Sequence, residues 1–237
     1  MAVNPKQIAA ERAVSHLRDG MTVGLGTGST AAFAIHALGR RFQAEPLALR
    51  CVATSRESEE LGRSYGLVFV EAADVSRFDV TVDGADEVDP AFRLIKGGGG
   101  ALVREKIVAA ATDAEIIIVD EGKVKDALGA HPLPVAILPF AWQWTQARLQ
   151  SDFGVPAPRR CLPSGDPFLN DDGLYILDMA FGAPLPSPDT LEARLKAVVG
   201  VVESGLFVGL CRRLIIGYAD GRIEERLNEK AAPALPG

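Results

Sequence analysis

The chain has 237 residues, which allows one large domain or two modest ones with a buried core. Its composition is that of an ordinary globular protein, with 48% hydrophobic and 24% charged residues. The net charge of −6 argues against a nucleic-acid-binding surface, which carries a basic excess, but it allows a small anionic ligand held by a few local cations.

Cysteine usage and hydropathy indicate the cellular setting. Cys51, Cys161 and Cys211 are far apart and lack CxxC spacing, which favours reduced thiols over a disulfide framework or a zinc site. No apolar run approaches the length of a membrane span, and residues 1–20 lack the apolar core of a signal peptide. We therefore expect a cytoplasmic protein without a membrane partner.

Short apolar runs alternate with amphipathic stretches in the first half of the chain. We expect helices at 1–20, 29–41, 55–65 and 101–111, and strands at 22–26, 47–53, 67–70, 79–82, 92–95 and 115–120. This alternation is typical of an α/β fold in which helices cover both faces of a mostly parallel sheet. Ligands bind such sheets at the carboxyl ends of the strands, where the turn at Gly26, the acids at 83–87 and the glycines at 97–100 all fall.

The composition changes near 131–134, where a smaller α+β domain is predicted to begin. We expect a strand at 135–140, a helix ending near Phe153, a hairpin at 162–178 that turns at 170–173, and a helix at 187–199 capped by Ser187 or Asp189. The chain then returns to the first domain, with a strand at 214–218, a turn at 220–221 and frayed residues at 231–237. The predicted domains are therefore 1–130 with 207–237, and 131–206.

The three histidines bear on the kind of catalysis. His16 and His36 fall in helical stretches and His131 precedes a proline-rich segment, so we expect none of them near the acids at 83–87 or the glycines at 97–100. Histidine triads and histidine-rich metal sites are thereby disfavoured. A general base in this chain is predicted to be a carboxylate.

The segment Gly24–Thr30 follows a strand and opens a helix. It lacks the third glycine of a dinucleotide fingerprint, because Ser29 stands there, and no Gly-Lys-Ser/Thr of a nucleotide P-loop follows. A tight turn that presents N–H groups and two hydroxyls at a helix N-terminus suits a phosphate monoester. The alternative is a simple glycine turn in which Ser29 or Thr30 caps the helix.

Acids and glycines gather in the middle of the chain. Asp83–Glu87 could be a solvated acidic turn, and Lys96–Gly100 could be a flexible linker. A linker would not run directly into a strong helix, and glycines there allow a ligand to approach the backbone closely. Glu105 falls in the first turns of that helix, where it could simply favour the helix dipole. Together these segments predict a site that moves protons and holds an anion.

Seven segments carry a resemblance to a known family. They are Thr27–Thr30, Asp83–Asp86, Lys96–Gly99, Ala101–Lys106, Asp120–Lys123, Pro132–Val135 and Gly205–Phe207. In this order they resemble the signature segments of type A ribose-5-phosphate isomerase, and the resemblance extends from Lys6 to the turn at 220–221. The departures are small: Val103 and Ser58 stand where threonine is usual.

The resemblance implies a Rossmann-like catalytic domain and a smaller ferredoxin-like α+β domain for assembly into a homodimer. The activity it implies is an aldose–ketose isomerisation that interconverts D-ribose 5-phosphate and D-ribulose 5-phosphate through ring opening and an enediolate, in the non-oxidative pentose phosphate pathway. It implies a small-molecule sugar phosphate as partner and neither a metal nor an organic cofactor.

The family's roles carry over to matching positions of this chain. Glu105 is the expected base for the carbon-bound proton, and Asp83 is the leading candidate for ring opening, with Asp86 and Lys96 assisting. Lys96 also offers its charge to the developing oxyanion. The expected substrate contacts are Lys6, Thr27, Gly28, Ser29, Thr30, Gly84, Ala85, Gly97, Gly98, Gly99 and Lys123. Among these, Ser29 and Thr30 would hold the phosphate, with Lys6 and Lys123 as counter-charges.

Two other kinds of function remain open at this stage. A non-catalytic sugar-phosphate sensor of the same fold would need an attached DNA-binding module, for which neither terminus has the length or the basic charge. A related sugar-phosphate deaminase would need a histidine near the site, and a coenzyme A transferase would need a glutamate within its own motif. Glu87 is predicted to be structural, and Trp142 and Trp144 receive no role.

Overall fold

The computed structural model describes residues 3–231, which form two compact units. Unit 1 comprises 3–85, 104–124 and 209–231, and unit 2 comprises 86–103 and 125–208. The chain enters unit 2 after Ala85 and again after Val124. The chain crosses between the units four times. Two of these crossings, after Ala85 and after Val103, lie inside the predicted site motifs Asp83–Asp86 and Ala101–Lys106.

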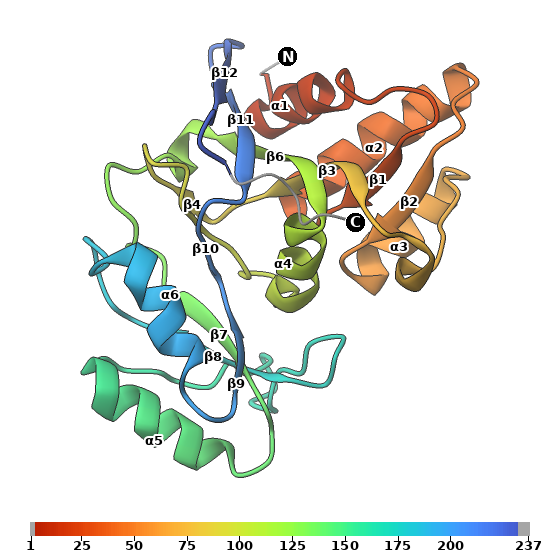
Figure 1. Ribbon diagram of the computed structural model, residues 1–237. Coiled ribbons are helices and arrows are strands. Elements are labelled where there is room, and N and C mark those ends of the chain that lie inside the picture. The colour runs from red at the N-terminus through yellow and green to blue at the C-terminus, as the bar shows by residue number, and fades with distance from the viewer. Residues whose placement is uncertain (1–2, 232–237) are drawn as a thin grey trace. The chain divides into compact units, whose positions relative to one another are not determined.

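Unit 1 is built on a six-stranded sheet in the order β12-β11-β6-β3-β1-β2 (Figure 1). All neighbouring strands are parallel except the terminal pair β11 and β12. This confirms the mostly parallel α/β sheet. The strands are β1 (Thr22–Leu25), β2 (Arg50–Ala53), β3 (Phe78–Gly84), β6 (Thr112–Asp120), β11 (Cys211–Gly217) and β12 (Ile223–Leu227).

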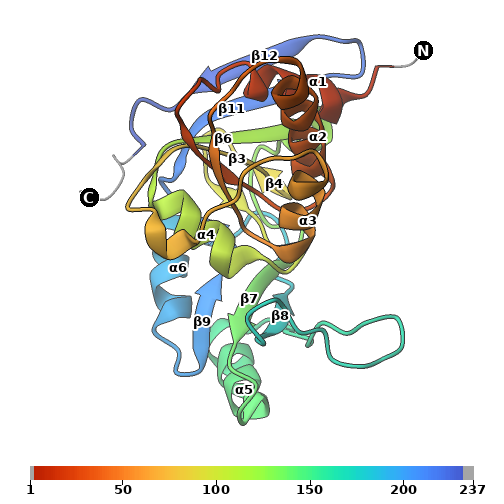
Figure 2. The same ribbon diagram turned by 90° about the vertical axis from the view of Figure 1, so that its right-hand side faces the viewer.

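Helices cover both faces of this sheet, as predicted. Alanines and leucines of α1 and α2 pack with Val23, Val80 and Ile116 on one face. On the other face α4 contributes Val108, which packs with Val52. Figure 2 shows α1 and α2 along one side of the strands and α4 along the other. The helices are α1 (Pro5–Val14), α2 (Ser29–Ala44), α3 (Arg56–Ser64) and α4 (Leu102–Ala110), with short 3-10 turns η1 (Ala72–Asp74) and η2 (Glu121–Lys123).

Unit 2 is an α+β unit with two small antiparallel sheets. One sheet has the order β8-β7-β9 and the other β10-β5-β4. Leucines and valines of β7, α5 and α6 form its main core. The elements are β4 (Glu87–Val88), β5 (Leu94–Ile95), β7 (Leu133–Ile137), α5 (Trp142–Phe153), β8 (Tyr175–Met179), α6 (Pro188–Lys196), β9 (Val201–Ser204) and β10 (Leu206–Phe207).

Several predicted elements differ in the structure. The predicted strand at 67–70 is wrong, because this segment makes only a single bridge between Phe69 and Cys51. The predicted hairpin at 162–178 is also wrong in its pairing. Its turn at 170–173 is present, with the Gly173 amide donating to the Asn170 carbonyl, but β8 pairs with β7. Long-range pairing thus outweighs the local hairpin pattern.

The ends of several elements also differ from the prediction. The first helix ends at Val14 rather than near residue 20, and the side chain of Ser187 makes no capping hydrogen bond to α6. The turn at 220–221 is confirmed, and it leads into β12, which the sequence reading did not predict. Of the residues predicted to fray, 232–237 lie outside the described part of the chain. Among residues 3–231, no helix is long and apolar enough to cross a membrane.

Candidate active site

The loop after β1 is packed against a buried carboxylate of β3. Asp83 is 1% exposed, and its Oδ1 accepts hydrogen bonds from the backbone amides of Thr27 at 3.2 Å and Gly84 at 2.7 Å. A Cβ atom at Gly26 would lie 1.9 Å from the same oxygen. Glycine is therefore required at 26 by close approach, because no other side chain fits against Asp83.

The N-terminus of α2 has no side-chain cap. Gly28 is the capping residue, with φ of 95°, and neither hydroxyl predicted as an alternative cap plays that part. Ser29 is exposed, and its Oγ accepts a hydrogen bond from Lys6 Nζ at 3.2 Å. An uncapped helix N-terminus with a lysine and two hydroxyls beside it can bind a phosphate.

Two buried hydroxyls, those of Thr54 and Ser58, support this loop. Neither was predicted as a site residue, and Ser58 was noted only as a departure from the usual threonine. Thr54 Oγ1 lies 2.7 Å from Thr27 Oγ1, and Ser58 Oγ donates to the Gly26 carbonyl at 2.7 Å. Both follow β2, whose carboxyl end lies at the same edge of the sheet as that of β1. The signal that could have found them is the hydroxyl-rich stretch that directly follows a predicted parallel strand.

Lys123 and Glu105 are two further predicted site residues of unit 1. Lys123 is half-buried in η2, directly after β6, at the edge where the parallel strands β3 and β6 end. Glu105 lies in the first turn of α4 and is only 5% exposed. A carboxylate with a role limited to the helix dipole would be solvated, so its burial favours a chemical role.

In unit 2 the glycine loop is held against Asp86. The Gly98 amide donates to Asp86 Oδ2 at 2.8 Å, and the Gly100 amide donates to the Gly97 carbonyl at 2.9 Å. Gly97 and Gly100 have φ of 97° and 87°, which glycine adopts at little cost. The loop is therefore an ordered turn, and the alternative of a flexible linker is wrong.

Lys96 precedes this turn and is 2% exposed. Its backbone amide donates to the Gly205 carbonyl at 2.8 Å, and its Nζ lies 5.5 Å from the centre of the Phe207 ring. The Lys96 backbone is thus held by the residue before β10, and its ammonium group lies beside the ring of Phe207 in β10. Burying a lysine is costly, so its position indicates a functional charge.

His131 lies close to Asp86, so the expectation that no histidine is near the acids is wrong. Its Nε2 is 3.9 Å from Asp86 Oδ2. The cause is Glu87, which is 2% exposed and accepts hydrogen bonds from the amides of Gly129 and His131, both at 2.7 Å. The structural role predicted for Glu87 is confirmed, and this buried acid is what brings His131 to the site.

Each unit therefore collects its own part of the predicted site. Unit 1 brings together Lys6, Thr27, Gly28, Ser29, Thr30, Asp83 and Gly84 at the carboxyl ends of β1 and β3. Unit 2 brings Asp86 together with Gly98, beside Lys96 and Gly97. No group of three or more potential metal ligands is found among residues 3–231.

Comparison with known proteins identifies the family. The family model described as ribose 5-phosphate isomerase A (phosphoriboisomerase A) matches residues 50–221. The chain is 50% identical over 232 residues to a ribose-5-phosphate isomerase A of Gloeobacter violaceus, covering 96% of this chain and 97% of that protein. It is 43% identical over 219 residues to the Bacillus mycoides protein of the same name, covering 92% and 98%.

Solved structures agree in sequence and fold. A D-ribose-5-phosphate isomerase in complex with phospho-erythronic acid is 34% identical, with a TM-score of 0.91 over 96% of this chain and all of that one. Ribose 5-phosphate isomerase A of Methanocaldococcus jannaschii is also 34% identical, with a TM-score of 0.88 over 94% and 98%. The chain thus belongs to the ribose-5-phosphate isomerase A family.

Proposed function

We propose that this protein interconverts D-ribose 5-phosphate and D-ribulose 5-phosphate in the cytoplasm, as a step of the non-oxidative pentose phosphate pathway. Relatives across nearly the whole chain carry this name. The observation that carries the proposal is the burial of three ionisable side chains in the matching motifs, because such groups gather at active sites. They are Asp83, Lys96 and Glu105, which are 1%, 2% and 5% exposed.

The phosphate is bound by the loop that opens α2. The helix N-terminus, the Ser29 and Thr30 hydroxyls and the Lys6 ammonium group all favour a dianion, and Lys123 adds a further counter-charge. Thr27, Gly28, Gly84 and Ala85 shape the same surface. Binding energy from this remote group orients the reacting carbons, so a substrate without phosphate loses rate as well as affinity.

The chemical steps use acids, a lysine and backbone amides. Asp83 opens the furanose ring by moving a proton between O1 and the ring oxygen, with Asp86 and Lys96 assisting. Glu105 then removes the proton from C2 and returns it to C1, while a second proton passes from the O2 hydroxyl to O1, so that no proton is gained or lost overall. Lys96 and the amides of the glycine loop stabilise the negative oxygen of the enediolate. No step requires a metal or an organic cofactor.

The substitution Glu105→Gln tests the base. The amide keeps the size of the side chain but cannot take a proton, so turnover falls by about 10³-fold or more while the fold and sugar-phosphate binding persist. Ketose formation from ribose 5-phosphate measures it, in buffer without added metal. Glu57→Gln is the matched control, because Glu57 is an exposed first-turn glutamate of α3. Near-normal turnover of the Glu105 variant would sink the base assignment.

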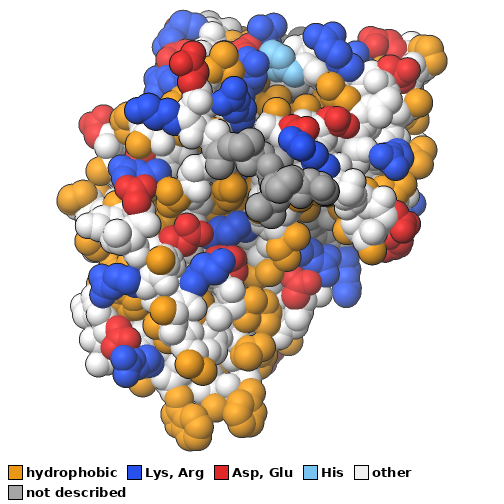
Figure 3. Space-filling model, in the orientation of Figure 1, with side chains coloured by type: hydrophobic (Ala, Val, Ile, Leu, Met, Phe, Trp, Pro, Cys, Tyr) orange, Lys and Arg blue, Asp and Glu red, His pale blue; other side chains and the backbone are white. Residues whose placement is uncertain are grey.

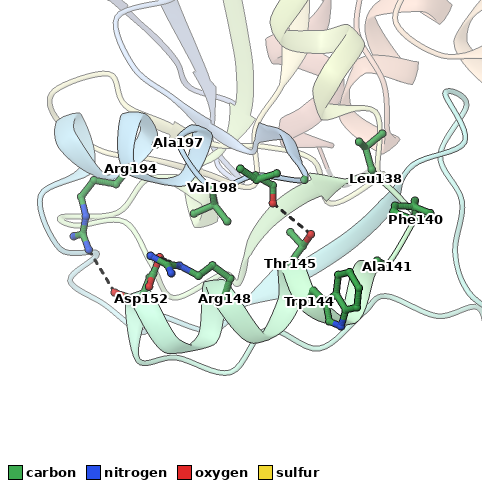
Figure 4. Close-up of a pocket in the computed structure, with 12 residues that line it drawn as sticks. Leu138, Phe140, Ala141, Trp144, Thr145, Arg148, Asp152, Arg194, Ala197 and Val198 are labelled. Atoms are coloured by element: carbon green, nitrogen blue, oxygen red, sulfur yellow. Dashed lines mark hydrogen bonds and ion pairs between the residues drawn. The ribbon is translucent and has the colours of Figure 1, made fainter.

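We also propose that the protein is a homodimer that assembles through the domain at 131–206. A groove of about 660 Å³ runs along α5 beside the turn that precedes β9 (Figure 4). Four apolar side chains at this groove are 50–93% exposed: Leu138, Phe140, Trp144 and Val199. In Figure 3, hydrophobic side chains gather at the lower end of unit 2.

A second copy of the chain fits this face best. The four side chains offer on the order of 600 Å² per copy, and a pair buries about 1,200 Å², which is enough for a specific interface. Arg148, Asp152 and Arg194 supply both signs of charge at the other end of the groove (Figure 4). A two-fold interface needs such a self-complementary patch. This gives Trp144 a role, whereas Trp142 packs against Arg159 and Tyr175.

The oligomeric state of the double variant Phe140→Ser, Trp144→Ser tests the interface. We expect the wild type to sediment as a dimer and this variant as a folded monomer. Leu227→Ser is the control, because Leu227 is an equally apolar, 56% exposed residue of β12 in unit 1, and it should leave the dimer intact. A monomeric wild type, or a double variant that remains dimeric, would contradict the proposal.

A further inference from the structure

We propose that Arg160, tied to Asp178, is a positioning residue that holds the carbonyls of Gly97 and Gly98 so that the loop amides serve the reaction. The proposal rests on the isomerase function, because Arg160 would affect the reaction only through the loop amides and the acid Asp86 that one of them binds. Arg160 and Asp178 lie outside all the motifs that carry the family resemblance. The hydrogen bonds that join Arg160 to the loop and to Asp178 are all made within unit 2.

The guanidinium of Arg160 makes four hydrogen bonds. Its Nε and Nη2 donate to the two carboxylate oxygens of Asp178, at 3.0 and 2.5 Å. Its Nη1 donates to the carbonyls of Gly97 and Gly98, both at 3.0 Å. The two-pronged pair with Asp178 orients the plane of the guanidinium, and Nη1 then points at the loop.

Because the peptide group is planar, fixing a carbonyl on one side of the loop also fixes the direction of the next amide on the other side. In a trans peptide, the C=O of one residue and the N–H of the next point in opposite directions. Holding the Gly97 carbonyl therefore aims the Gly98 amide away from Arg160, and this amide donates to Asp86 Oδ2 at 2.8 Å. Holding the Gly98 carbonyl aims the Gly99 amide in the same way. Arg160 thus orients both an acid and an oxyanion donor.

The loop needs an external support of this kind. Four consecutive glycines have far more backbone freedom than any other tetrapeptide, so the chain by itself does not favour one set of carbonyl directions. Arg160 can supply this support, because its own backbone is hydrogen-bonded to β8 and to Phe168. The Arg160 amide donates to the Ile176 carbonyl at 2.8 Å, and its carbonyl accepts from the Phe168 amide at 3.0 Å.

Phe168 packs against both Arg160 and the glycine loop. Its ring lies 5.7 Å from the Arg160 guanidinium, and a Cβ atom at Gly100 would lie 2.5 Å from it. The aromatic ring and the guanidinium therefore pack directly on the loop backbone. Phe168 thus lies against the end of the loop at Gly100, beside the guanidinium that holds the Gly97 and Gly98 carbonyls.

The substitution Arg160→Lys separates this role from a role in folding alone. Lysine keeps a positive charge for Asp178, but its single ammonium group cannot make the planar four-bond arrangement. We expect a folded protein whose kcat falls about 10- to 100-fold while KM changes less than about threefold, because misplacement of catalytic groups costs rate. Lys196→Met is the control, since it removes another ion pair of unit 2, with Glu203, at 2.9 Å.

A further readout distinguishes positioning from general destabilisation. Hydrogen exchange of the Gly98 amide, followed by NMR in the free protein, should accelerate about tenfold or more in Arg160→Lys. The control variant Lys196→Met should leave this exchange rate unchanged.

The outcomes are separable. A wild type that does not isomerise ribose 5-phosphate would overturn the proposed function. Amide exchange of Gly98 alone would then test whether Arg160 orients the loop. An active wild type together with wild-type kcat and wild-type Gly98 amide exchange in Arg160→Lys would overturn the positioning role. A loss of activity that follows only the unfolded fraction would overturn it as well.

Discussion

The loop at 26–30 and the loop at 96–100 are both built on glycine, but they are held in opposite ways. The first is held by neighbours in the parallel sheet, the buried Asp83 and Ser58, and it leaves no room for a Cβ at Gly26. The second is held by Arg160, which lies over 60 residues away in sequence and reaches in with a long side chain.

This difference has a consequence for how the two loops respond to change. A loop that is held by close contacts with buried residues loses its geometry only when the surrounding fold is also destabilised. A loop supported by one side chain at its edge can lose its geometry while the rest of unit 2 persists. Stability and activity should therefore fall together in the first loop and separately in the second.

Among changes to the two loops, the largest effect is expected from Gly26→Ala. Its Cβ would lie 1.9 Å from Asp83 Oδ1 and 2.0 Å from its Cγ, and Asp83 is only 1% exposed. We expect a loss of about 1–3 kcal/mol of stability from overpacking. Activity should fall below about 1%, because Asp83 is displaced. Thermal unfolding and ketose formation measure the two effects.

Gly20→Ala is the control for Gly26→Ala. Gly20 has φ of 81° and nothing within 4 Å of its added Cβ, so the change carries only the strain of a left-handed alanine and leaves activity intact. If Gly26→Ala keeps full activity and stability, the tight support of the first loop is wrong.

A smaller effect, limited to catalysis, is expected from Gly98→Ala. Its Cβ would lie 2.7 Å from Asp86 Oδ1, but Asp86 is half-buried and can turn away. We expect kcat to fall about tenfold to a hundredfold, with little change in melting temperature. In an Asp86→Ala background the alanine at 98 should cost little more, because the group that it displaces is already gone. Equal losses in both backgrounds would argue against this coupling.

The next effect is on binding. Lys6→Met removes the ammonium group that donates to Ser29 Oγ at 3.2 Å. We expect KM for ribose 5-phosphate to rise about tenfold, the worth of one charge-assisted contact at an exposed site, with kcat nearly unchanged. Turnover of D-ribose, which has no phosphate, should not respond to the substitution. An unchanged KM would remove Lys6 from the phosphate site.

The smallest effect is expected away from both loops, in the β11–β12 hairpin. Hydrogen bonds from Arg226 and then Tyr218 lower the pKa of Glu224 to about 2. A lowered carboxyl pKa stabilises the fold above the unfolded pKa near 4.5, and this contribution is lost as the pH falls toward 2. Glu224→Gln should cost less than about 1 kcal/mol at pH 7, because the pair is solvent-screened.

Denaturant unfolding at several pH values checks the Glu224 prediction. The stability difference between the wild type and Glu224→Gln should shrink between pH 5 and pH 3, while isomerisation at pH 7 stays at the wild-type rate. A difference that grows as the pH falls would contradict the sign of this contribution.

The sequence predicted much of unit 1, because its signals are local. The strands that precede Gly26 and Asp83 and the helix that carries Glu105 were all expected, and the structural role of Glu87 was confirmed. Unit 2 was predicted less well. A turn at 170–173 was correct while the pairing around it was wrong, because strand partners are chosen by long-range packing.

The sequence by itself determined the α/β alternation, the chemistry of the motifs and the family, since periodicity and the order of residues carry this information. Only the tertiary structure decided which distant groups complete the site. His131 beside Asp86 and Arg160 on the glycine carbonyls depend on chain segments folding back over 45 residues or more, and no local pattern records such contacts. Buried charges and glycine backbones need partners, and folding supplied them from remote parts of the chain.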